Sequence, residues 1–169
     1  MNTQAIMITA LTGITAIAVA VLLLQLLTRK LKVAPDEDNR YNRSYSIWVC
    51  SLLLSLVLLF NTAVKLLSNA FEVILADKSI KEPLFPIVEK ISVFIGFSFL
   101  WFVALLVIAN LLSRMVFGKR NDRIEIERDN YIYFIIKGML LFLLVFTMTS
   151  VFENFLRLFM PVMETPFYH

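Results

Sequence analysis

Two apolar stretches of the chain carry polar residues at matching spacing, and these residues are the main candidates for chemistry. In the first stretch they follow one another at steps of three, four and three positions, which places them on one face of a helix. Hydroxyl, ammonium, amide and carboxylate groups on such a face could form hydrogen bonds and ion pairs or line a narrow hydrated path. This candidate polar cluster or path consists of Thr62, Lys65, Asn69, Glu72, Thr147, Ser150, Glu153, Asn154 and Arg157.

The two sets of polar residues are related by a constant offset of 85 positions, and an acid in one set corresponds to a base in the other. Glu72 corresponds to Arg157, and Asn69 corresponds to Asn154. We therefore predict that Glu72 and Arg157 can pair between two helices. The alternative is that Arg157 pairs with Glu153, four positions earlier on its own helix, and that these charges reach water near the membrane boundary.

The residue types needed for most catalytic and metal centres are scarce in this sequence. His169 is the only histidine and Cys50 the only cysteine, which disfavours a Ser-His-Asp arrangement, an internal disulfide and a thiolate metal cluster. The sequence also contains no glycine-rich phosphate-binding motif. We therefore predict that the chain is not an enzyme, with no catalytic residue, no cofactor and no metal.

The composition indicates a membrane protein. Hydrophobic residues make up 59% of the 169 residues and charged residues only 17%, whereas a soluble domain is usually less apolar and more charged. Four apolar stretches are long enough to cross a hydrocarbon core of about 30 Å as helices. The predicted spans are residues 4–28, 45–68, 89–114 and 131–160, and the second helix is expected to continue to residue 76. The fold class is therefore an all-α membrane protein with four transmembrane helices.

The distribution of Lys and Arg predicts the orientation in the membrane. The polar segments after the first and third spans each hold five basic residues, whereas the segment between the second and third spans holds three. Short basic loops stay in the cytoplasm, so we expect a multi-pass protein of the bacterial inner membrane with both termini outside the cytoplasm. The net charge of +3 is modest and no basic face is clustered, so nucleic acid is not an expected partner.

Five local features can be predicted within and beside the spans. Ser44 is the expected N-cap of the second span, and Asp129 or Asn130 that of the fourth. Residues Ile124–Glu127 alternate like a short strand, and Lys137 is expected to extend its side chain toward the nearby boundary. Small residues on the first span predict a face for close helix packing, formed by Ala5, Thr9, Thr12, Gly13, Ala16 and Ala20.

The offset of 85 positions extends well beyond the polar residues. The segment from Gln25 to Arg29 aligns with the segment from Asn110 to Arg114, and the correspondence continues to Glu72. We interpret it as a duplication of a two-helix unit, with residues 1–84 as the first repeat and 85–169 as the second. Because each unit has two spans, both insert in the same orientation. They should therefore be related by a pseudo-twofold axis along the membrane normal.

Two membrane hairpins in tandem, each with a polar loop that ends just before the returning helix, resemble the YjfL-like family of uncharacterised bacterial inner-membrane proteins. The residues that carry the resemblance are Asn42 or Ser44 with Tyr45, and Asn130 with Tyr131. The resemblance implies topology alone, because the family has no agreed activity.

Two functions fit this sequence. The first is a scaffold or subunit of a membrane complex, in contact with the lipid bilayer and with further copies of itself or another membrane subunit. The alternative is an oligomeric channel or transporter whose polar path is lined by the second and fourth spans. Passage of a solute across liposomes would distinguish the two.

Overall fold

The structure, a computed structural model, describes residues 3–31, 41–76 and 83–161, apart from the side chains of residues 4, 5, 27, 30 and 31. This part of the chain forms helices and no strands, so the all-α class is confirmed. Four helices are long and apolar enough to cross a membrane, and one is short. The helices are α1 (Thr3–Leu31), α2 (Arg43–Ala76), α3 (Leu84–Phe117), α4 (Asp122–Glu127) and α5 (Tyr131–Arg157).

The four predicted spans coincide with α1, α2, α3 and α5, although their ends differ by a few residues. Helix α2 continues to Ala76 as predicted, and its 34 residues reach about 51 Å, longer than a hydrocarbon core of about 30 Å. Helix α3 starts earlier than predicted, at Leu84. Pro86 fits there because a proline in the first turn lacks only an N–H that would have no helical partner.

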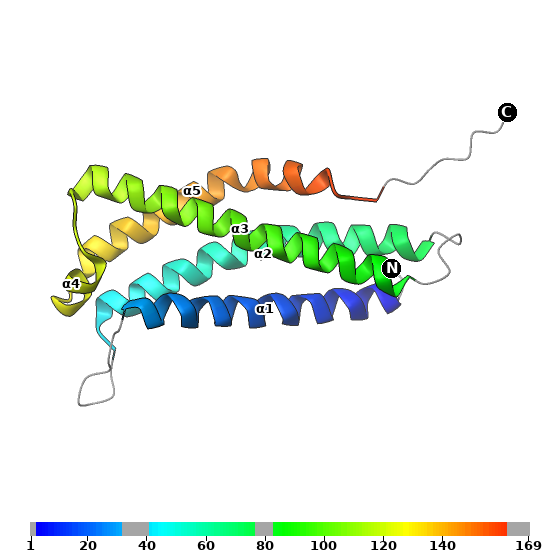
Figure 1. Ribbon diagram of the computed structural model, residues 1–169, viewed down its shortest axis with the longest axis horizontal. Coiled ribbons are helices and arrows are strands. Elements are labelled where there is room, and N and C mark those ends of the chain that lie inside the picture. The colour runs from blue at the N-terminus through cyan, green and yellow to red at the C-terminus, as the bar shows by residue number, and fades with distance from the viewer. Residues whose placement is uncertain (1–2, 32–40, 77–82, 162–169) are drawn as a thin grey trace.

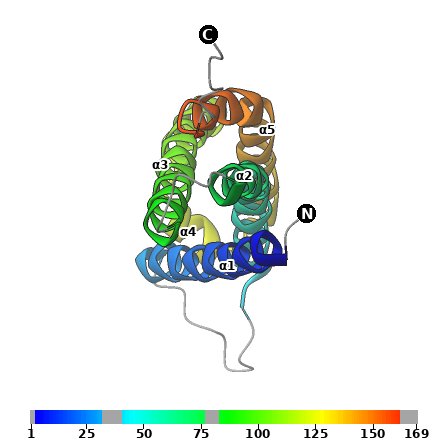
Figure 2. The same cartoon turned by 90° about the vertical axis from the view of Figure 1, so that its right-hand side faces the viewer.

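The long helices run up and down along one bundle. Helices α1 and α3 run in one direction and α2 and α5 in the opposite direction (Figure 1). Viewed along the bundle, α2 lies in the middle, with α1, α3 and α5 around it (Figure 2). Helix α3 also packs against α5, and α2 packs against each of the other three long helices, most extensively against α5. We call the end of the bundle that carries the start of α2, the end of α3, α4 and the start of α5 the basic end.

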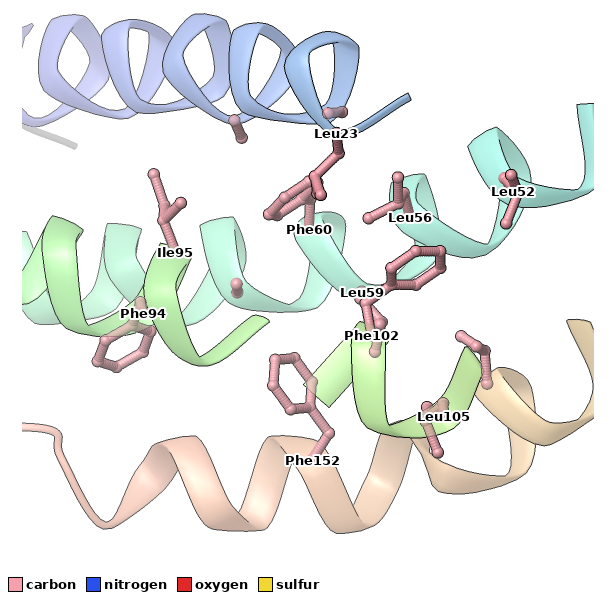
Figure 3. Close-up of a cluster of buried hydrophobic side chains, with 14 of the residues drawn as sticks. Leu23, Leu52, Leu56, Leu59, Phe60, Phe94, Ile95, Phe102, Leu105 and Phe152 are labelled. Atoms are coloured by element: carbon pink, nitrogen blue, oxygen red, sulfur yellow. The ribbon is translucent and has the colours of Figure 1, made fainter. Parts of the chain in front are cut away.

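Large apolar side chains fill the centre of the bundle. Apolar residues recur every three or four positions on α2, so one broad face of this helix is buried. Figure 3 shows these residues between side chains from α1, α3 and α5. The fully buried members include Leu52, Leu56, Leu59, Phe94, Phe102 and Phe152. The interior is therefore packed with side chains.

The small-residue face of α1 packs inward, as predicted, from Thr9 to Ala20; the Ala5 side chain, also predicted on this face, lies outside the described side chains. Thr12, Ala16 and Ala20 are buried, and the Thr9 hydroxyl lies 3.4 Å from the hydroxyl of Ser68 on α2. Small side chains let two helix backbones approach closely where apolar burial alone provides little driving force between helices in lipid. This face explains why α1 packs chiefly along α2.

Aromatic rings join α3 to α5 at the end of the bundle opposite the basic end. Phe97 packs against Phe155 and Phe159 with ring centroids 5.2 and 5.1 Å apart, and Trp101 packs against Phe152 at 5.8 Å. Such pairs stabilise by about 0.5–1.5 kcal/mol each beyond the area they bury. The second half of α5 is thus packed on α3.

Two local predictions are wrong, and one is confirmed. Residues Ile124–Glu127 belong to helix α4, because the Asn121 side chain accepts the N–H of Arg123 at 3.1 Å and starts a helical turn. Ser44 lies inside the first turn of α2, which begins at Arg43, and is not its N-cap. Asn130 is confirmed as the N-cap of α5, since its side chain accepts the N–H of Tyr133 at 3.4 Å.

The start of α2 is capped from the α4–α5 connection. The backbone N–H and the hydroxyl of Ser44 both donate to Asp129 Oδ1 at 2.9 Å, and the Asn42 side chain donates to the carbonyl of Ile126 at 3.0 Å. Asp129 has a positive φ of 47°, a conformation that Asp and Asn adopt more readily than most residues. A residue far along the chain thus provides the acceptor that a helix start needs.

We predict that this cap depends on pH. The N–H of Ser44 lowers the pKa of the Asp129 carboxyl below its ordinary value of 3.8; burial opposes this, while the Ser44 hydroxyl and the charge of Arg43 lower it further. A lowered pKa in the folded state stabilises the protein above the unfolded-state pKa, and this stabilisation is lost as pH falls through the folded-state pKa. Asp129→Ala should cost about 1 kcal/mol at neutral pH and less below about pH 4.

Thermal unfolding of the detergent-solubilised protein at several pH values measures this difference. Asp129→Asn is the matched control, because it keeps an acceptor oxygen and tolerates the positive φ but does not titrate. A loss in the alanine variant that stays constant between pH 7 and pH 3 would contradict the prediction.

Candidate functional site

The first set of predicted polar residues lies on an outward face of α2. Lys65, Asn69 and Glu72 are exposed, and Thr62 is half-buried. The Thr62 hydroxyl donates to the carbonyl of Leu58 at 3.2 Å, so its hydrogen bond is made within its own helix. These residues therefore face the surroundings of the bundle.

The second set has the same outward position on α5. Thr147, Ser150, Asn154 and Arg157 are exposed, and Glu153 is half-buried. The Thr147 hydroxyl donates to the carbonyls of Leu143 and Leu144 at 2.9 and 3.0 Å. Arg157 Nη2 donates to Glu153 Oε1 at 2.6 Å along the same helix, as in the alternative derived from the sequence.

The structure does not bring the two sets together. In residues 41–76 and 83–161, no hydrogen bond or ion pair joins them, and Arg157 is paired with Glu153 instead of Glu72. The physical reason is that α2 and α5 pack through other faces, formed by residues such as Leu52 and Leu141. We call the two sets the outer stripes.

A different polar site lies inside the basic end, around Lys137. This side chain is only 2% exposed, and its Nζ atom donates to Asp122 Oδ2 at 2.6 Å. The Tyr133 hydroxyl donates to the other oxygen of the same carboxylate at 2.9 Å. Nζ also lies 4.8 Å from the centre of the Trp48 ring, within the range of a cation–π interaction. The Lys137 side chain extends toward the basic end, as predicted, but it does not reach water there, because an acid and an aromatic ring enclose it.

Local structure on both sides of the site positions this pair. Gly118 ends α3 with a φ of 74°, a conformation that glycine adopts without steric cost, and the chain then turns back into α4. Asp122 is the first residue of α4, directly after its N-cap Asn121. Lys137 lies one turn beyond Tyr133 on the buried face of α5. The turn and the helix face together bring Asp122 to Lys137.

A second group of polar contacts supports α4. Glu125 is buried, and its carboxylate accepts from Asn130 Nδ2 at 2.6 Å and from Arg120 Nη1 at 3.4 Å. Arg123 donates to Glu127 at 3.0 Å on the exposed side of the same helix. The first group ties the α3–α4 turn to the start of α5, so α4 is fixed over the site.

A cavity of ≈ 740 Å³ opens beside Lys137. It lies among α2, α3, α4 and α5 and has both charged and apolar walls. Its lining residues are Trp48, Leu52, Leu106, Asn110, Arg114, Lys119, Arg120, Asn121, Asp122, Arg123, Tyr133 and Lys137. We call it the basic cavity.

One feature of the sequence indicates this site. Lys137 is the only charged residue between Tyr131 and Phe152, and steps of four place it on one helix face with Tyr133 and Leu141. An apolar neighbour on each side along that face is typical of a buried position. Asp122 carried no comparable signal, because only the turn after α3 brings it near.

No protein-family model, curated protein or solved structure matches this chain. The four long apolar helices in one bundle indicate the class, a multi-pass helical membrane protein. In the part of the chain that the structure describes, no group of His, Cys, Asp and Glu side chains is placed to hold a metal ion. The resemblance to the YjfL-like family stays a prediction.

Proposed function

We propose that this chain is a non-enzymatic, polytopic protein of the bacterial inner membrane that acts as a scaffold or subunit of a membrane complex. The observation that carries the proposal is the exposure of the outer stripes. Lys65, Asn69 and Glu72 on α2, and Ser150 and Asn154 on α5, face outward from a bundle whose interior is filled by other side chains.

Exposed polar groups on membrane helices favour contact with another protein. A polar side chain without a hydrogen-bond partner is costly in hydrocarbon, and contact with a second helix lowers that cost. The hydroxyls of Thr62 and Thr147 already bond to their own helices. Lys65, Asn69 and Asn154 have no such bond in the described residues, so a second copy of the chain or another subunit would supply their partners.

Contacts at the basic end support a duplicated hairpin with both copies upright in the membrane. Residues on a pseudo-twofold axis meet their own counterparts, and Ser44 is hydrogen-bonded to Asp129, 85 positions later. Trp48 and Tyr133, also 85 apart, lie on α2 and α5 with their rings 4.8 and 5.7 Å from Lys137 Nζ. We propose that this axis runs along the membrane normal, with the basic end in the cytoplasm and both termini outside.

An oligomeric channel or transporter is the second candidate. The observation that bears on it is that the outer stripes face away from the bundle interior. A polar path lined by these stripes could therefore form only between copies of the chain. Liposome flux tests this candidate. Selective passage that is lost in Lys65→Leu and Asn154→Leu would favour the channel, and tight liposomes together with a stable partner would favour the scaffold.

We predict that the outer stripes contact protein in native membranes. A photo-reactive amino acid at Asn69 or Asn154 should cross-link to a second polypeptide of defined mass, detected by electrophoresis and mass spectrometry. The same amino acid at Leu54 or Phe146, exposed apolar positions on the same two helices, is the matched control and should react mainly with lipid. If the stripe positions also react only with lipid, the scaffold proposal is wrong.

A further inference from the structure

We propose that the basic cavity binds a phosphate group, carried either by the headgroup of an anionic lipid or by a small soluble phosphate compound. The inference concerns a different surface from the outer stripes and does not depend on the scaffold proposal. It follows from the charge, the donors and the shape of the cavity.

The lining carries far more positive than negative charge. Asp122 is the only carboxylate in it, and its cations are Arg114, Lys119, Arg120, Arg123 and Lys137. Arg120 pairs with Glu125 and Arg123 with Glu127, and Asp122 is taken by Lys137. The acids thus account for three of the five cations.

Within the described part of the chain, Arg114 and Lys119 are the two cavity cations left without a carboxylate. Neither forms an ion pair with any residue in 3–31, 41–76 or 83–161. Both line the same cavity, one in the last turn of α3 and the other just after it. A phosphate between them would satisfy both charges, and the guanidinium fork of Arg matches two phosphate oxygens. The amide of Asn110, one turn earlier on α3, adds a neutral donor to the lining.

The shape of the cavity suits an amphiphilic ligand. Leu106 lies eight residues before Arg114 on α3, about 12 Å further from the basic end. Leu106, Leu52 and Trp48 form an apolar wall, and Arg114 and Lys119 stand nearer the end of the bundle, in and just after the last turn of α3. A headgroup phosphate at Arg114 and Lys119 would place the adjoining carbon atoms of a lipid against this wall, as in the basic pockets between membrane helices that bind anionic headgroups.

The test compares three forms of the full-length protein in detergent: wild type, Arg114→Gln with Lys119→Gln, and Arg128→Gln. Arg128 is an exposed cation of α4's C-terminal cap that does not line the cavity, so it controls for loss of charge at the same end. Native mass spectrometry measures binding of phosphatidylglycerol against phosphatidylcholine, and equilibrium dialysis measures binding of inorganic phosphate. The double variant should bind about thirtyfold more weakly than wild type, which corresponds to about fivefold for each cation removed.

The outcomes separate the two sources of phosphate. Binding of phosphatidylglycerol that inorganic phosphate does not displace supports a lipid headgroup, whereas displacement supports a site for the phosphate group itself. Circular dichroism and gel filtration confirm that the double variant is folded. The proposal is overturned if neither ligand binds to wild type, or if the double variant binds as well as Arg128→Gln.

Discussion

Replacement of Asp122 by alanine should lower the free energy of unfolding by about 3 kcal/mol, the largest effect expected from a single side chain here. The reason is that Lys137 is 2% exposed and takes its one carboxylate contact from Asp122 at 2.6 Å. Without this partner a charged ammonium stays buried and uncompensated. The side chain of Asp122 is 32% exposed and borders the basic cavity, so water reaching the gap keeps the expected cost at the low end of the range for broken buried pairs.

Two further variants identify the cause of that loss. Asp122→Ala combined with Lys137→Met removes both charges and should recover most of the stability, because no buried charge is then left without a partner. Glu127→Ala breaks the exposed Arg123 pair and should cost at most about 1 kcal/mol. Denaturation in mixed micelles measures all three. If Asp122→Ala is as stable as Glu127→Ala, Lys137 is not held by this carboxylate.

The helices could be predicted from the sequence because a membrane span requires a continuous run of apolar residues. A helix that crosses hydrocarbon must be apolar over about 20 residues, and that requirement is visible residue by residue. The face of α1 that packs inward was predictable for a similar reason, since Thr12, Ala16 and Ala20 share one side of a helix. The partner of a polar or charged side chain cannot be recognised in this way, because it can lie anywhere along the chain.

The buried pair at the basic end shows where sequence reasoning failed. The position of Lys137 in the fourth span lies near the membrane boundary, and a long charged side chain at such a position usually reaches water. Its true partner, Asp122, lies 15 positions earlier and on another helix. Only the turn at Gly118 and the short helix α4 bring the two together, and the alternation of Ile124 and Ile126 had suggested a strand there.

The outer stripes show that the sequence also does not determine which way a polar helix face points in the bundle. Spacing predicted correctly that each set lies on one face of a helix, but it could not specify which way that face points. The apolar residues of α2 and α5 decide this, because burial of Leu52, Leu59 and Leu141 turns the polar faces outward. Glu153 and Arg157 then meet along their own helix. The packing of the apolar residues between helices therefore determines which way the polar residues face.

The second large effect is expected at Gly138 on α5, whose backbone lies directly against Ser51 of α2. A Cβ atom built on Gly138 would overlap Oγ of Ser51 and lie 2.7 Å from its Cβ, which is closer than real Cβ contacts. Gly138→Ala should therefore force the two helices apart and destabilise the bundle by about 1–3 kcal/mol, even though alanine favours helix formation. Loss of this approach would also move Trp48 away from Lys137, since both lie within one turn of the contact.

Gly96→Ala on α3 is the matched control, because no atom from beyond its own helical turn lies within 4 Å of the added methyl group. That variant should be as stable as wild type or slightly more stable. Ser51→Gly removes both atoms that oppose the methyl group, so Gly138→Ala combined with Ser51→Gly should regain much of the lost stability. Thermal unfolding in detergent measures the set. Equal stability of Gly138→Ala and Gly96→Ala would mean that α2 and α5 do not approach each other at this position.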